Sequence, residues 1–126
     1  WRGADRWRLH VGLALLDHSC ELRPGEADLQ SQPGGASDPD GWGKLRVAFD
    51  LGASTELDFM ARHYGSIENR SVPSYTALDA RLAWHPRRRL EVSLLLQNLL
   101  DEGHVEWGPG AEFERGAFLK VRIGLQ

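Results

Sequence analysis

The chain has 126 residues, 41% of them apolar, and a formal net charge of −3. No run of about 20 apolar residues is present, which excludes a helical membrane protein. The slightly acidic balance argues against a nucleic-acid-binding surface, which is normally basic. The single cysteine, Cys20, excludes a disulfide or a paired-cysteine metal site within the chain. The length corresponds to one domain, residues 1–126, and because the chain begins at Trp1 in the middle of a pattern, we expect a segment of a longer protein.

The first half of the chain contains three segments in which apolar and polar residues alternate. The first spans residues 6–16, where apolar residues from Trp7 to Leu15 alternate with polar or small ones. The second spans residues 44–51 and the third residues 54–64, with the same period of two. This period is typical of strands that have one apolar and one polar face.

Three further segments of this kind follow. They span residues 75–84, 89–97 and 117–126. Residues 94–100 are apolar enough for a helix, but Asn98 interrupts them and their alternation continues backward into the preceding strand. The sequence therefore predicts an all-β fold, an antiparallel up-and-down meander of about six strands.

The lengths of these segments favour a membrane barrel. Most run for 8 to 11 residues. A tilted strand needs about 9 to 11 residues to cross the hydrocarbon layer of a bilayer, whereas strands of globular proteins are commonly about 5 or 6 residues long.

The connections alternate between short and long. Tight turns are expected at Gly52-Ala53 and at residues 85–88, whereas residues 17–43, 65–74 and 98–116 form long connections. In a meander, alternate connections lie at opposite ends of the sheet. All tight turns should therefore lie at one end, together with the C-terminus, as in outer-membrane barrels with short periplasmic turns and long extracellular loops.

Aromatic residues support this orientation at one end. Trp7 and Trp84 fall on the apolar face near the tight turns, where the aromatic girdle of a barrel is expected. Tyr64, Tyr75 and Phe118 lie near the long loops, but their position in the alternation places them on the polar face.

Several short motifs lie in a fixed order on the ends of these strands. They are Val-Pro-Ser-Tyr-Thr-Ala-Leu-Asp at 72–79, Gln-Asn-Leu-Leu-Asp at 97–101, His-Val-Glu-Trp at 104–107, Glu-Arg-Gly at 114–116 and Phe-Leu-Lys-Val-Arg-Ile at 118–123. With them, the chain from about residue 42 to its end resembles the C-terminal part of the barrel of TonB-dependent outer-membrane receptors.

The resemblance implies a fragment of a larger transmembrane β-barrel in the outer membrane of a Gram-negative bacterium. Such receptors import scarce nutrients, most often ferric siderophores, and the TonB complex energises them through an N-terminal plug. The plug and the earlier strands are absent from this sequence. About eight strands are the minimum for a membrane barrel, so we expect the fragment alone not to transport and to associate with itself.

The end of the chain departs from the family. Such barrels usually end in an aromatic residue, most often Phe, whereas this sequence ends Gly124-Leu125-Gln126. We expect either an unusual native end or further residues beyond it.

The sequence predicts no enzyme, cofactor or metal site. His104 and Glu106 could chelate a metal weakly, but their spacing is more typical of a polar loop, and Ser93 lies in no nucleophile motif. Ligand contacts are expected in the long loops and are left unassigned, although Trp42, Arg70 and Trp107 are residue types favoured at recognition surfaces.

The polar sides of the predicted strands carry many charges, and we call this the charged face. In a receptor these residues would line the lumen and face the plug, and in any other sheet they would meet water. They are Arg8, Arg46, Asp58, Arg62, Asp79, Arg81, Glu91, Lys120 and Arg122.

A soluble protein is the alternative hypothesis. A small soluble β-barrel or sandwich that binds an apolar ligand would show the same alternation of residues. The two hypotheses differ in the environment of the apolar face, which meets lipid in the first and forms the core in the second.

Overall fold

A computed structural model describes residues 2–3, 6–17, 38–67, 70–106, 110 and 112–124 of the chain. Within these residues the fold is all β, with no α-helix. The strands are β1 (Arg2–Gly3), β2 (Trp7–Leu15), β3 (Gly41–Asp50), β4 (Thr55–Tyr64), β5 (Tyr75–Arg87), β6 (Leu90–Gln97), β7 (Gly103–Val105), β8 (Glu112–Glu114) and β9 (Gly116–Ile123). In this part of the chain, no helix has the length and hydropathy needed to cross a membrane.

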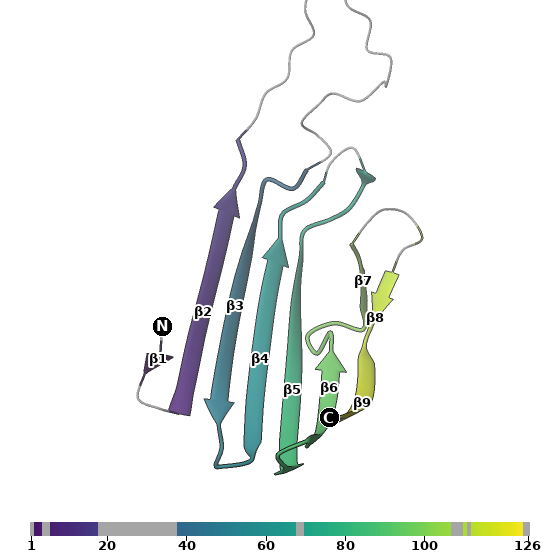
Figure 1. Ribbon diagram of the computed structural model, residues 1–126. Coiled ribbons are helices and arrows are strands. Elements are labelled where there is room, and N and C mark those ends of the chain that lie inside the picture. The colour runs from purple at the N-terminus through teal and green to yellow at the C-terminus, as the bar shows by residue number, and fades with distance from the viewer. Residues whose placement is uncertain are drawn as a thin grey trace, which may run out of the picture.

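The six long strands form one antiparallel meander. Their order is β2-β3-β4-β5-β6-β9, and the two-residue strand β1 pairs with the start of β2. Figure 1 shows them side by side in a single layer. This confirms the predicted meander of six strands. The sheet is open, because among the described residues β9 pairs only with β6.

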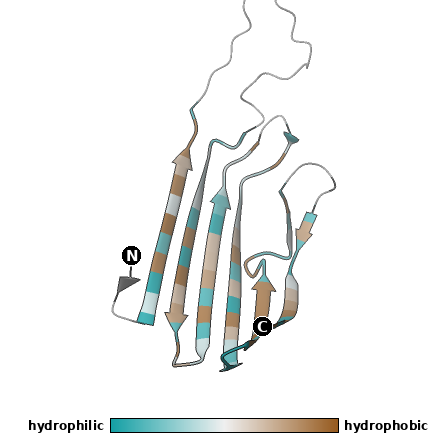
Figure 2. Cartoon of the chain, in the orientation of Figure 1, coloured by the Kyte–Doolittle hydropathy of each residue, from teal (hydrophilic) through white to brown (hydrophobic). Residues whose placement is uncertain are grey.

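The register keeps like residues in rows across the sheet. One row runs from Leu9 through Val47, Phe59, Ala80 and Leu96 to Ala117. Because a slip of one residue would move every side chain of a strand to the other face, the alternation itself specifies this register. The alternating bands along the strands are visible in Figure 2. We call the side that carries this row the apolar face.

The connections follow the predicted alternation. In Figure 1 the tight turns that join β3 to β4 and β5 to β6 lie at the lower end of the sheet, and β2 and β4 run up to its opposite end, where the long connections begin. Strand β9 finishes at the tight-turn end, where the amide of Gly124 donates a hydrogen bond to the carbonyl of Arg89 over 2.9 Å. Most of the first long connection, residues 18–37, lies outside the described residues.

One predicted turn is displaced. Strand β5 does not end at Trp84 but continues to Arg87, and its register with β6 shifts between these two residues. Pro86 has no backbone N–H to donate to a ladder, so it is accommodated at an irregularity of the sheet. The turn itself is formed by Arg88-Arg89.

The third long connection contains structure that the sequence did not predict. Strands β7 and β8 form a small antiparallel hairpin within residues 98–116. Strand β3 also begins at Gly41, three residues before its predicted start at Lys44.

The two faces of the sheet differ in exposure, and the buried side chains of β3, β4, β5 and β6 all lie on the charged face. Its side chains include Asp58, Asp79 and Glu91, which are 7 to 8% exposed. On the apolar face, by contrast, Leu13 is 79% exposed and Leu119 is 73% exposed. Within the described residues, nothing packs over this apolar face as a second layer.

Candidate functional site

Ion pairs join neighbouring strands across the charged face. Each of the five seams between the six long strands has at least one arginine–carboxylate pair. From β2 to β9 these pairs are Arg8–Asp50 at 2.9 Å, Arg46–Asp58 at 2.6 Å, Arg62–Asp79 at 2.8 Å, Arg81–Glu91 at 2.6 Å and Arg122–Glu91 at 3.4 Å.

Arg81 lies at the centre of this network. One of its terminal nitrogens donates to Asp58 over 3.0 Å, and the other donates to Glu91 over 2.6 Å. The planar guanidinium holds several donors in a fixed fork, so one side chain can join carboxylates from the strands on both of its sides. Buried carboxylates need such partners, because an unpaired charge away from water costs on the order of several kcal/mol.

Small residues make this network possible. Ala48, Ala77 and Ala83 are buried on the charged face between the long side chains. Their methyl groups leave room for the arginines to lie across the sheet. Alanines thus lie between arginines and carboxylates on the charged face, and the long charged side chains lie flat across the strands in a polar layer.

The β7–β8 hairpin folds back over this face at the long-loop end. Its residue Glu106 accepts hydrogen bonds from His104 over 2.8 Å and from Arg62 of β4 over 3.3 Å. Because a carboxylate only accepts, His104 Nε2 must carry the proton in this contact. The same arginine also donates to Asp79 of β5 over 2.8 Å, so one guanidinium links the hairpin to the sheet.

Three aromatic rings stack beside this contact. Tyr64 and Tyr75 are opposite each other on β4 and β5, and their ring centroids lie 5.4 Å apart. The ring of His104 lies 4.3 Å from that of Tyr75 at an angle of 24°. The hairpin is therefore attached to the sheet by both ring stacking and charged hydrogen bonds.

Asn98 forms the corner from which the hairpin departs. Its backbone has a φ of 56°, in the left-handed region that Asn tolerates better than most residues. The amide N–H donates to Asp79, and the side-chain amide donates to the carbonyl of Phe113, each over 3.0 Å. Arg115 closes the corner by donating to the Asn98 carbonyl over 3.3 Å.

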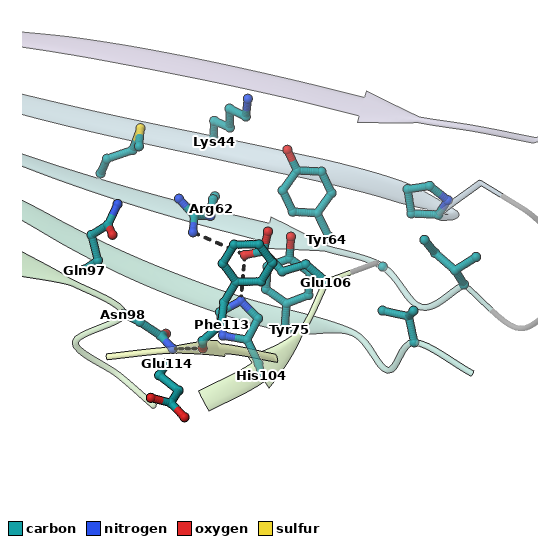
Figure 3. A pocket seen from close by; sticks show the side chains of 15 residues that line it. Lys44, Arg62, Tyr64, Tyr75, Gln97, Asn98, His104, Glu106, Phe113 and Glu114 are labelled. Atoms are coloured by element: carbon teal, nitrogen blue, oxygen red, sulfur yellow. Dashed lines mark hydrogen bonds and ion pairs between the residues drawn. The ribbon is translucent and has the colours of Figure 1, made fainter. Parts of the chain in front are cut away.

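A pocket of about 550 Å³ lies between the hairpin and the sheet. Figure 3 shows Lys44, Arg62 and Tyr64 projecting from the sheet toward it, with His104 and Glu106 on the hairpin side. Its wall is aromatic and aliphatic with a few charged groups, as in pockets for small molecules. It lies at the long-loop end of the charged face.

The structure places the predicted residues as follows. All nine charged-face residues lie on the same side of the sheet, and all of them except Lys120 have an ion pair within the described residues. Trp42 lies at the start of β3, where the Lys44 ammonium is 5.3 Å from its ring. Arg70 is exposed between β4 and β5, and Trp107 lies outside the described residues.

The structure separates Ser93 from the two other residues considered for chemistry, His104 and Glu106, which contact each other. Ser93 is 1% exposed, and its hydroxyl has no hydrogen-bond partner in the described part of the chain. His104 and Glu106 do come together, but with Arg62 rather than with a third metal ligand. No group of three metal-ligating side chains is found among the described residues.

Sequence reasoning missed the stacked rings and the Asn98 corner. The alternating pattern places Tyr64 and Tyr75 on the charged face at the long-loop end, and this is the signal from which their stacking could have been predicted. The stacking of Tyr75 on His104 depends on how the hairpin folds back over the sheet. The alternation of residues does not specify this.

Comparisons of the chain with protein-family models, with curated proteins and with solved structures gave no match.

Proposed function

We propose that the chain is part of the wall of a transmembrane β-barrel in a TonB-dependent receptor of a Gram-negative outer membrane. The observation that carries the proposal is the exposure of the two faces. The buried side chains of the long strands lie on the charged face, whereas most of the exposed large apolar residues lie on the other face. The motifs on the strand ends supply the resemblance to this particular family.

The apolar face is costly in water and favourable in lipid. Fully burying a Leu, Val or Phe side chain contributes about 1.5–3 kcal/mol, and β2, β3, β5 and β9 each carry exposed large apolar residues on this face. Acyl chains would cover them without a second protein layer. The paired charges of the other face would then line the lumen.

The soluble alternative requires the opposite arrangement. A barrel or sandwich that binds an apolar ligand would enclose the apolar face and expose the charges. Here Trp84 of the apolar face is 52% exposed, while Asp58 of the charged face is 7% exposed. This difference favours lipid over an internal core as the environment of the apolar face.

The geometry also supports a role in the receptor for the charged face. Its mixed signs allow a polar plug to form and exchange contacts with it. The pocket at the long-loop end would open toward the extracellular side, from which an iron–siderophore complex or a similar nutrient arrives. The TonB complex would act through the plug, and six strands alone would associate rather than transport.

Deletion of the encoding gene in its host tests this proposal. Under iron limitation we expect the deletion strain to lose energy-dependent uptake of a radiolabelled ferric siderophore, tested over a panel of catecholate and hydroxamate types. The protein should also fractionate with the outer membrane of the parent strain. Unchanged uptake across the panel, together with the protein in the soluble fraction, would contradict the proposal.

A further inference from the structure

The turn between β5 and β6 carries three consecutive arginines. Arg87 ends β5, and Arg88 and Arg89 form the turn itself. All three residues are exposed. Within the described residues, neither Arg87 nor Arg88 has an ion pair. Two arginines are therefore available at the tight-turn end of the sheet, and the network of the charged face does not use them.

The register shift in β5 determines the face on which Arg87 lies. Trp84 is opposite Val92 of β6. Arg87 is opposite Leu90, so two residues of β5 face one residue of β6 between these two pairs. Without the shift, Pro86 would be opposite Leu90 and the arginine would lie on the charged face. A bulge of this kind re-aims the side chain that follows it, and here it places Arg87 on the apolar face.

Arg87 is the one strongly charged residue on that face. In the six long strands as the structure describes them, the apolar face has no other arginine and no lysine, aspartate or glutamate. The row of Arg87 continues through Leu90 to Ile123 of β9, which is 65% exposed. The neighbouring row contains Trp84, which is 52% exposed. The charge therefore lies at the margin of the apolar face, beside an exposed tryptophan.

The carboxylates near this turn do not neutralise it. Asp50, Glu56 and Glu91 lie at the same end of the sheet but on the charged face. Each of them is within ion-pair distance of an arginine of that face. Arg87 and Arg88 are therefore left without a counter-charge among the described residues.

We propose that the β5–β6 turn and Trp84 form a binding site for the headgroup of an anionic phospholipid, with Arg87 and Arg88 on its phosphate. This inference rests on the proposed placement of the apolar face in lipid. The guanidinium fork matches the geometry of a phosphate, and tryptophan is favoured at the level of the headgroups. Because a charge within the hydrocarbon is costly, Arg87 extends its head to the interface, where the phosphates lie.

The net charge of the headgroup determines which lipid fits this site. A zwitterionic headgroup carries its own cation beside the phosphate, and that cation repels the two arginines. The headgroup of phosphatidylglycerol has a phosphate without such a cation. Basic clusters at a membrane surface attract anionic lipids, and each arginine adds to the attraction. The site should therefore select phosphatidylglycerol over phosphatidylcholine, and salt should weaken the selection.

Lipid-selective quenching of Trp84 fluorescence measures this selection. The full chain, with its other four tryptophans replaced by Phe, is reconstituted in phosphatidylcholine vesicles. Part of the lipid is replaced by brominated phosphatidylglycerol or, at the same mole fraction, by brominated phosphatidylcholine. We expect the quenching curves to give about fivefold higher affinity for phosphatidylglycerol at low salt, the effect of one arginine near an anionic surface. The ratio should fall at high salt.

Two sets of variants make the test specific. R87Q/R88Q should abolish the preference while both brominated lipids still quench Trp84, and R87K/R88K should retain part of it because the charges remain. R70Q removes an exposed arginine between β4 and β5, at the opposite end of the sheet, and should leave the preference unchanged. Circular dichroism of each variant checks that the sheet is retained.

The outcomes separate this inference from the proposed receptor function. Equal affinity for the two lipids, or a preference that R87Q/R88Q leaves intact, would overturn the inference alone, because Trp84 would still contact lipid. Quenching of Trp84 by neither brominated lipid would overturn the proposed placement of the apolar face, and the inference with it.

Discussion

Arg81 occupies the position where removal of one side chain should be most damaging. Its two buried partners, Asp58 and Glu91, lie on the strands to either side of β5. We expect R81M to lower the free energy of unfolding by about 2 kcal/mol, because hydrogen bonds to charged groups contribute roughly 1.5–3 kcal/mol. Asp58 and Glu91 would lose their shared partner and retain the more exposed Arg46 and Arg122. Urea titration of the chain in detergent micelles, followed by circular dichroism, measures this.

R122M is the matched control for this change. Arg122 pairs with the same Glu91, but its side chain is largely exposed. Exposed pairs contribute about 1 kcal/mol or less, so the control should be nearly as stable as the unaltered chain. If the two substitutions lowered the free energy of unfolding equally, burial of an ion pair would not determine how much it contributes to stability.

Individual pairs of this kind could not be predicted from the sequence. Alternation did place all nine charged residues on one face, and the structure agrees. The partners, however, depend on strand register, which joins residues distant in the chain: Arg8 and Asp50 are 42 residues apart. They also lie diagonally across the seam, since Arg8 is directly opposite Ala48.

The β7–β8 hairpin is the element most dependent on a few polar contacts. Glu106 connects it to the sheet through Arg62 and accepts from His104 within the hairpin. We expect E106Q to speed amide hydrogen exchange in β7 and β8 about tenfold, since hydrogen bonds to charged groups contribute roughly 1.5–3 kcal/mol. Exchange in β3 and β4 should not change.

E114Q supplies the comparison for this prediction. Glu114 is exposed at the end of β8, and it has no ion pair within the described residues. Its substitution removes the same charge from the same hairpin without touching Arg62. If the amides of β7 and β8 exchanged equally fast in both variants, the contact of Glu106 with Arg62 would not be what holds the hairpin on the sheet.

The long strands were predictable and the short ones were not. Six strands carry enough alternating residues to show a period of two, and the structure contains all of them. β7 and β8 have three residues each, too few for a period to be seen. The predicted end of β5 was wrong because Pro86 is typical of a turn. In the structure the strand continues past Pro86, which lies where the register with β6 shifts.

At the scale of the whole described sheet, the buried side chains of the long strands lie on the charged face. A water-soluble sheet of this size would cover its apolar face with a second layer, because that burial is the main favourable contribution to folding. The described residues instead place ion pairs, stacked rings and a hairpin on the charged face. This arrangement supports the proposed placement of the sheet between lipid and a polar lumen.

Two tryptophans on opposite faces allow the most direct test of this account. Trp84 lies on the apolar face and Trp42 on the charged face. Single-tryptophan variants, with the other four tryptophans replaced by Phe, would be reconstituted in phospholipid vesicles with brominated acyl chains. The account predicts strong quenching of Trp84 fluorescence and little quenching of Trp42. Equal quenching of the two, or quenching of neither, would contradict it.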